Sequence, residues 1–155
     1  MALTMTSSVF TNMQPKGPHV GVVTVRGTMN FPDATTTKPS VGDIAFLCKV
    51  PHGAVITDIR VEHTCADTIG LDYGVATGTT IGGSASYSAF VSALAKGTIS
   101  RMSALNTSAG FTISVSDADP NRYGIVSAKI ASVSAATATV TIYFTVEYSY
   151  DRNTN

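Results

Sequence analysis

The stretch ATATVTIYFTVEYSY, residues 136–150, alternates apolar and polar side chains along its whole length. Successive side chains of a β-strand point to opposite faces, so this pattern predicts a strand with one dry face and one face rich in threonine. Such a strand is longer than usual, and we expect it to span the whole domain and to bend at a bulge. The dry face is predicted to hold Ala138, Val140, Ile142, Phe144, Val146, Tyr148 and Tyr150.

Seven further segments carry β-branched or alternating residues and are separated by turns rich in glycine and proline. They are residues 19–27, 44–50, 55–65, 70–78, 98–105, 110–117 and 123–133. About eight strands with such turns are typical of two packed sheets. We therefore predict an all-β fold, an antiparallel β-sandwich of the jelly-roll kind.

One segment departs from the β pattern. In SASYSAFVSALAKG, residues 84–97, the apolar residues Tyr87, Phe90, Val91 and Leu94 follow helical spacing. A serine can cap the start, and Lys96 followed by glycine suits the end. We expect one short amphipathic helix here, lying across the edge of a sheet with its aromatic residues in the core.

The length of 155 residues suits a single domain with a sizeable core. Residues 1–19 are polar, contain two prolines and show no sustained period, so we expect an extended arm. The sandwich domain then covers residues 20–150, and residues 151–155 form a tail. The first residues lack the features of an export signal, and no run approaches the ~20 apolar residues that cross a bilayer. We expect a soluble product without a membrane partner.

Charge is scarce and balanced. Ten basic and ten acidic residues cancel, and charged residues make up 13% of the chain, about half the usual quarter. The absence of a basic excess argues against a nucleic-acid partner. A weakly charged surface rich in serine and threonine suits a protein whose outside contacts other subunits, which we favour, and a thermally stable monomer would have the same composition.

The reactive residues of LCKVPHGAVITDIRVEH, residues 47–63, are predicted to point apart. The period of two puts Ile56, Asp58, Arg60 and Glu62 on one face of the strand, and Val55, Thr57, Ile59, Val61 and His63 on the other. The link at residues 51–54 contains a proline and a glycine, which favours a hairpin turn. This face of alternating charge predicts a solvated surface or contact with a polar partner.

The cysteines and candidate metal ligands are few. In the hairpin interpretation Cys65 lies about 26 Å from Cys48, too far for a disulfide, so both thiols are expected to be free. His63 and Cys65 could share a metal, but no second pair has ligand spacing. Asp117, Asp119 and Asn121 have the spacing of the first three ligands of an EF-hand calcium loop. The glutamate that such a loop needs at its twelfth position is missing. We predict no catalytic, cofactor-binding or metal-binding residue.

The stretches GDIAFLCKVPHGAVITDIRVEH and TIGLDYGVATGT resemble small virion structural proteins of tailed bacteriophages, the capsid decoration or cement proteins. The likeness covers residues 40–95 in detail and is structural, without a catalytic residue to transfer. It is carried by Gly42, Asp43, Ala45, Lys49, Val50, Pro51, Gly53, Ala54, Leu71, Asp72, Gly74 and Ala76.

The resemblance implies a β-sandwich or jelly-roll module that is a dimer or trimer on the outer capsid surface and bridges neighbouring major capsid subunits. The resemblance also implies that the protein assembles in the host cytoplasm and has no enzymatic activity. Two alternatives stay open: a phage tail- or fibre-associated domain that binds a host receptor or glycan, and a small metal-dependent enzyme that uses His63 and Cys65. The absence of tryptophan and the scattered tyrosines argue against a glycan binder, and the dispersed acids and histidines argue against an enzyme.

Overall fold

A computed structural model describes residues 4–8, 22–31, 39–51, 54–77, 86–98, 100–102, 111–112, 123–133 and 139–149. The elements of this part are all strands, which agrees with the predicted all-β class. They are β1 (Thr4–Thr6), β2 (Val22–Phe31), β3 (Ile44–Pro51), β4 (Val55–Thr64), β5 (Ile69–Thr77), β6 (Ser86–Ala95), β7 (Ser100–Met102), β8 (Phe111–Thr112), β9 (Tyr123–Val133) and β10 (Val140–Ser149).

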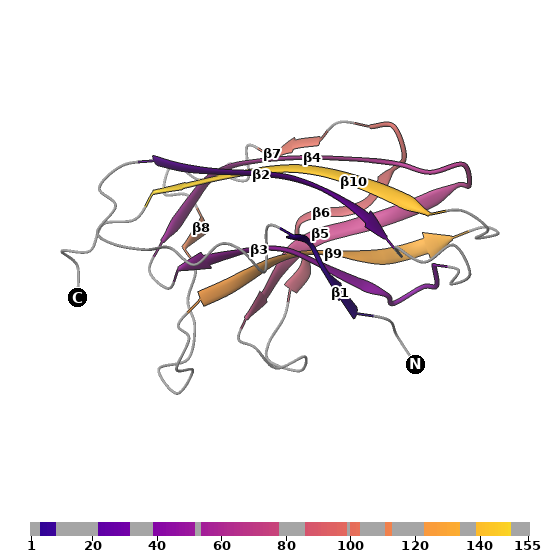
Figure 1. The fold of residues 1–155 in the computed structure, drawn as a ribbon, viewed down its shortest axis with the longest axis horizontal. Helices are drawn as coiled ribbons and strands as arrows, with labels where there is room; N and C mark the ends of the chain where they lie inside the picture. The colour runs from indigo at the N-terminus through magenta and orange to yellow at the C-terminus, as the bar shows by residue number, and fades with distance from the viewer. Residues whose placement is uncertain are drawn as a thin grey trace.

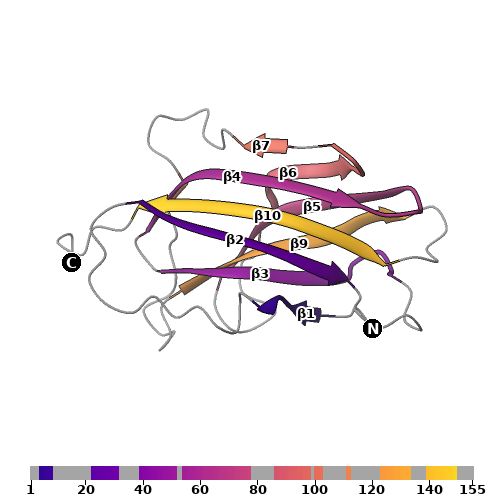
Figure 2. The same ribbon diagram turned by 45° about the horizontal axis from the view of Figure 1, so that its top comes forward.

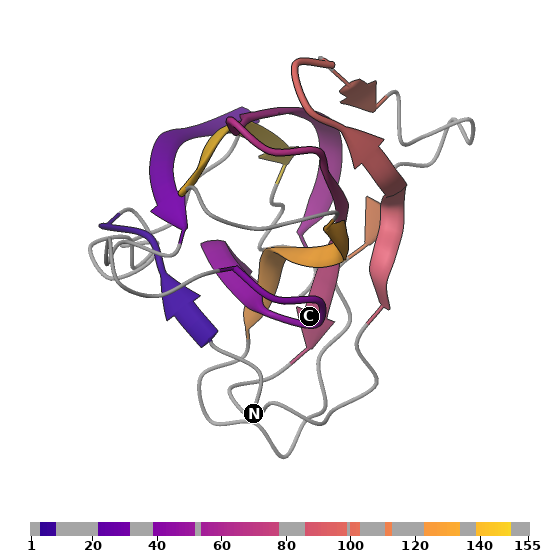
Figure 3. The same ribbon diagram turned by 90° about the vertical axis from the view of Figure 1, so that its right-hand side faces the viewer.

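The strands form two sheets that face each other across one interior (Figures 1 and 3). One sheet has the order β1-β3-β9-β5-β6, and the other has the order β2-β10-β4-β7, with β8 also paired to β4. Figure 2 shows β10 between β2 and β4 on the side nearest the viewer. Every pairing is antiparallel except the one between β1 and β3.

The core lies between the two sheets and follows the predicted alternation of β10. Val140, Ile142, Phe144, Val146 and Tyr148 are at most 2% exposed, while the residues between them point outward. This buried face packs against apolar residues of β2, β3, β4, β5 and β9. The prediction of a long strand with one dry face is confirmed for the described residues 140–149, and its register with β4 shifts between Glu147 and Tyr148.

The predicted hairpin between β3 and β4 is wrong, although the turn itself is present. The amide of Ala54 donates to the carbonyl of Pro51 at 3.1 Å. The chain then crosses to the other sheet, because β3 pairs with β1 and β9 whereas β4 pairs with β10, β7 and β8. Residues Ile44–Cys48 are all buried, so β3 is covered on both faces. A turn motif specifies a reversal of direction but leaves open which sheet receives the next strand.

The predicted helix is also wrong, because Ser86–Ala95 is an edge strand. Its register with β5 shifts twice, and Ala93 has a φ of 50°. The Asp72 carboxylate accepts the Ala93 amide at 2.8 Å, which fixes this irregular conformation. Extra residues in an edge strand break the period of two. The neighbours Phe90 and Val91 both contact the core, and Leu94 is buried as well, so these three residues imitate helical spacing.

The first described residues contact the chain's own sheet. Strand β1 lies parallel to the first half of β3, and Met5 packs against the core. Ser7 is buried; its amide donates to the Phe46 carbonyl at 2.9 Å, and its hydroxyl donates to the Leu47 carbonyl. Residues 9–19 of the predicted arm and the tail at 151–155 lie outside the described residues. The proposed division into arm, domain and tail stays a prediction.

Candidate interaction surface

The outward side of the β2-β10-β4 sheet is a regular grid of side chains. The strand pairings place one residue from each of β2, β10 and β4 in line across the sheet. We call this surface the outer face and name its rows by their character. They are the threonine row (Asn30, Thr141, Thr64), the tyrosine row (Thr28, Tyr143, Glu62), the arginine row (Arg26, Thr145, Arg60), the acidic row (Thr24, Glu147, Asp58) and the valine row (Val22, Ser149, Val55).

Charge is arranged in bands along this face. Glu62 in the tyrosine row is followed by the two arginines, and these are followed by Glu147 and Asp58. Both arginines are exposed, and neither makes an ion pair or a hydrogen bond with a residue in the described part of the chain. The outer face therefore presents two unneutralised guanidinium groups between two acidic bands. The predicted face of Asp58, Arg60 and Glu62 is confirmed, and its charges lie within a larger pattern.

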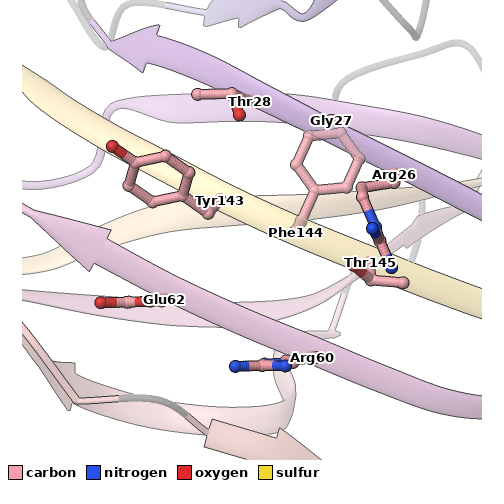
Figure 4. Close-up of a pocket in the computed structure, with 8 residues that line it drawn as sticks. All are labelled: Arg26, Gly27, Thr28, Arg60, Glu62, Tyr143, Phe144 and Thr145. Atoms are coloured by element: carbon pink, nitrogen blue, oxygen red, sulfur yellow. The ribbon is translucent and has the colours of Figure 1, made fainter.

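The centre of the outer face is hollowed around Tyr143. An open depression of about 300 Å³ is lined by both arginines and by residues of all three strands (Figure 4). Figure 4 shows Tyr143 on β10 with Thr28 on the strand to one side and Glu62 on the strand to the other. The tyrosine side chain is 43% exposed. Tyrosine and arginine are enriched among the residues that dominate the binding energy of protein interfaces, so this depression suits contact with another protein.

A β-bulge sets which residues of β4 reach the outer face. Glu147 is opposite Asp58 and Tyr148 is opposite Ile56, so Thr57 has no partner on β10. Its hydroxyl donates to the Glu147 carbonyl at 3.3 Å. Ile56 is consequently buried and Thr57 is exposed, the reverse of the prediction for these two residues. The predicted alternation assumed an unbroken strand, whereas a bulge moves every residue beyond it to the other face.

His63, one of the two candidate metal ligands on β4, is a fully buried core residue. Its Nε2 lies 3.4 Å from the Ile69 carbonyl oxygen, and its Nδ1 lies 3.2 Å from the Tyr73 hydroxyl. A carbonyl can only accept, so Nε2 carries the proton and Nδ1 accepts the tyrosine O–H. Because β4 and β5 belong to different sheets, the pair of His63 and Tyr73 joins the two layers of the sandwich.

Burial determines the protonation of this pair. Desolvation lowers the pKa of His63 below 6.5, and the hydrogen bond to Ile69 and the charge of Glu62 oppose that change only in part. Desolvation also raises the pKa of Tyr73, with a smaller contribution from Glu62. Both groups are therefore neutral near pH 7, where each makes a hydrogen bond that suits its neutral form. This arrangement stabilises the fold and leaves the imidazole without access to a ligand.

The remaining candidates do not form a reactive centre in the described residues. Neither Cys48 nor Cys65 forms a disulfide. Cys48 is buried, and desolvation raises its pKa to about 12. No three histidine, cysteine, aspartate or glutamate side chains of the described ranges gather closely enough to hold a metal ion. The possible calcium ligands Asp117, Asp119 and Asn121 fall outside those ranges. No helix within them is long and apolar enough to span a membrane.

Sequence reasoning missed Arg26 as a member of the candidate surface. The alternation of β2 marks Arg26 as outward, because Val25 is buried while Arg26 is exposed. Its place beside Thr145, and thus across from Arg60, depends on a pairing between strands more than a hundred residues apart. The alternation of β10 places Tyr143 on the outward face of that strand, and the structure shows it exposed there.

Comparison with known proteins shows likeness at the level of the fold. No protein-family model and no curated protein matches the chain. A chain in the solved capsid of Ralstonia phage GP4 superimposes with a TM-score of 0.63 at 21% identity, covering 94% of this chain and 97% of that chain. A chain in the capsid asymmetric unit of cyanophage Pam1 gives a TM-score of 0.56 at 21% identity, covering 90% and 94%. The chain thus shares its fold, over nearly its whole length, with proteins found in two bacteriophage capsids.

Proposed function

We propose that this protein is a virion structural protein, a capsid cement or decoration protein of a tailed bacteriophage. It binds the outside of the shell, bridges neighbouring major capsid subunits and resists their separation under the pressure of packaged DNA. Its partners are the major capsid protein and further copies of itself, as a dimer or trimer. It assembles onto the shell in the host cytoplasm and catalyses no reaction.

The observation that carries this proposal is the fold shared with chains of two phage capsids, with at least nine-tenths of both chains aligned in each case. Coverage of that extent means that the whole domain is alike, rather than a common hairpin or sheet. Fold alone does not determine function, so the resemblance of residues 40–95 to cement proteins supplies the more specific part of the proposal.

The strand pairings support a jelly roll as the finer description of the fold. The outermost long strands pair as β2 with β10, the next as β3 with β9, then β4 with β7 and β8, and the innermost as β5 with β6. Successive pairs alternate between the two sheets. A single long hairpin of strands rolled into a sandwich has this order, and it is an arrangement used by viral capsid domains.

The chemistry of the described residues suits a brace rather than a reactive pocket. His63, the most buried ionisable side chain of β4, makes hydrogen bonds to Ile69 and Tyr73 of the opposite sheet. The outer face combines tyrosine, arginine and threonine with three carboxylates, and tyrosine and arginine are enriched among the residues that dominate protein interfaces. Many copies at equivalent positions on a shell multiply the weak affinity of each contact.

A second function, binding of a host receptor or glycan by a tail- or fibre-associated domain, is favoured by one observation. The depression around Tyr143 combines an exposed aromatic ring with hydroxyl, carboxylate and guanidinium groups, which is a combination that can hold a sugar. This alternative predicts binding to host cells by the isolated protein.

The test uses shells of the phage that carries the gene, prepared without this protein. Cement function predicts that the added protein co-sediments with the shells at a fixed stoichiometry and raises their melting temperature. Shells that already carry a full complement are the control and should bind no more. A reconstruction of the decorated shell by electron microscopy should place the protein over junctions between capsid subunits. Failure to bind shells, together with saturable binding to host cells, would replace this proposal with the receptor-binding one.

A further inference from the structure

We propose that the outer face of the β2-β10-β4 sheet contacts the same face of a second copy, about a two-fold axis that runs across the strands between the arginine and acidic rows. This deepens the proposed function and rests on it, because it assigns the self-association of that proposal to one surface. The contact can be tested with the isolated protein, without shells. Its outcome is therefore separate from the outcome of shell binding.

Only one orientation of two copies lets the charge bands match. With the sheets face to face, a two-fold axis parallel to the strands places the arginine row of one copy on the arginine row of the other. An axis across the strands instead reverses the order of the rows. Centred between the arginine and acidic rows, it places each arginine row on the partner's acidic row, twice over. This exchange follows from the order of the rows in the strand registers.

Individual residues meet suitable partners in this arrangement. Each strand faces its own copy, so Arg60 on β4 lies opposite Asp58 of the partner subunit. Arg26 on β2 lies opposite a threonine, with Glu147 of the partner subunit on the neighbouring strand. The two arginines have no ionic partner within the described part of their own chain. The contact would supply one.

The same operation also matches the exposed apolar residues. The tyrosine row falls on the partner's valine row, so Tyr143 faces the surface formed by Val22, Ser149 and Val55 of the partner subunit. Val22 is 65% exposed and Tyr143 is 43% exposed, and both belong to the outer face. One two-fold axis thus pairs opposite charges in the middle of the contact and covers apolar side chains at both ends. Two independent properties of the surface point to the same register.

The size of the contact predicts a weak association in solution. Four rows of each copy, the tyrosine, arginine, acidic and valine rows, face the partner. They extend about 27 Å along the strands and about 14 Å across the three strands, which is about 400 Å² of each copy. The total of about 800 Å² lies below the roughly 1,200–2,000 Å² of stable specific complexes, in the range of weak ones. We therefore expect a monomer–dimer equilibrium that depends on protein concentration and weakens as salt screens the paired charges. Arrangement of many copies on a shell would strengthen it.

Charge reversal provides a test with internal complementation. Arg26→Glu with Arg60→Glu makes both central rows acidic, and Asp58→Lys with Glu147→Lys makes both central rows basic. Each double variant should self-associate at least about tenfold more weakly than the wild type in sedimentation equilibrium, because attractive pairs become repulsive. A mixture of equal amounts of the two variants should form the dimer again, since each supplies the charge that the other lacks.

Controls separate this contact from changes in folding or total charge. Lys49→Glu with Lys96→Glu alters the net charge as much as the arginine variant does. These lysines lie on β3 and in the turn after β6, outside the outer face, so this variant should leave self-association unchanged. Circular dichroism and thermal melting test whether each variant is folded. If the double arginine variant is not folded, Arg60→Gln alone takes its place and should weaken self-association, by less than the tenfold expected of the double variant. A wild type that stays monomeric at high concentration, a control that weakens association as much as the arginine variant, or a mixture that does not associate would each overturn the proposal.

Discussion

The hydrogen bond between Tyr73 and His63 should contribute measurably to stability. Replacing Tyr73 by phenylalanine removes the hydroxyl that donates to Nδ1 of His63 at 3.2 Å and changes little in shape. The buried imidazole then keeps an acceptor without a donor, which costs about 1–3 kcal/mol in the free energy of unfolding. Combining this change with His63→Leu should cost less than the sum of the two single changes, because the second removes the orphaned acceptor.

The same histidine should make stability depend on pH. Burial lowers the pKa of folded His63 below its value of 6.5 in an unfolded chain, so the unfolded state binds the proton more readily. Above about pH 6.5 the imidazole is neutral in both states, so His63 does not change the free energy of unfolding with pH. Below that value the unfolded state takes up the proton, and the free energy of unfolding falls as the pH drops. One proton sets the limiting slope at about 1.4 kcal/mol per pH unit. The loss stops growing once the pH is below the pKa of the folded state.

The assay is urea unfolding followed by circular dichroism at a series of pH values between about pH 8 and about pH 5. His63→Gln is the matched variant, because it removes the titrating ring and retains the histidines at positions 19 and 52. The difference between the wild-type and His63→Gln curves isolates the contribution of His63. Equal losses of stability in both proteins on acidification would refute the assignment of the pH dependence to His63, and an unchanged stability of Tyr73→Phe would refute the hydrogen bond.

Three further predictions concern single positions. Gly42 has a φ of 95°, and no neighbouring atom lies within 4 Å of the place that an added methyl group would take, so Gly42→Ala should cost only the backbone strain, about 1–2 kcal/mol by urea unfolding. Ser7→Ala removes the donor to the Leu47 carbonyl and should lower the free energy of unfolding by about 1 kcal/mol; no change would show that β1 adds nothing through this contact. In the native protein a thiol reagent should modify the half-buried Cys65 well before Cys48, whose burial raises its pKa to about 12. Cys65→Ser should abolish that early reaction.

The faces of individual strands could be predicted from the sequence wherever the strand is regular. The alternation of β10 identified its buried side chains, and that of β4 identified the outward charges from Asp58 to Glu62. These predictions hold because the period of two is a local property of the extended backbone. They depend on no knowledge of the neighbouring strands.

Irregular strands defeated the same reasoning. Thr57 has no partner on β10, and this bulge turns Ile56 inward and Thr57 outward, opposite to the predicted faces. In β6, whose register against β5 shifts twice, the neighbours Phe90 and Val91 both contact the core and, with Leu94, match the spacing of a helix. A bulge is stabilised by bonds to a neighbouring strand, such as the bond from Ala93 to Asp72, and that neighbour cannot be identified from the local sequence.

The candidate surface was predictable only in part, for a related reason. Tyr143 and the charged residues of β4 could each be placed on a wet face from their own strands. Their assembly with Arg26 into rows required the pairing of β10 with β2 on one side and β4 on the other. The metal hypothesis for His63 and Cys65 failed to gain support because His63 points into the core, toward a tyrosine of the opposite sheet.

The place of β10 has a consequence for how the protein is made. It is the last of the described strands in chain order, yet it lies between β2 and β4 in its sheet. Until the ribosome has released residues 140–149, these two earlier strands lack their shared neighbour, and the half-made sandwich has a gap down the middle of one layer. Contacts between such distant segments form slowly. This sheet cannot be completed before β10 has been made, and a nascent chain stalled before β10 should remain an easy target for proteases and chaperones.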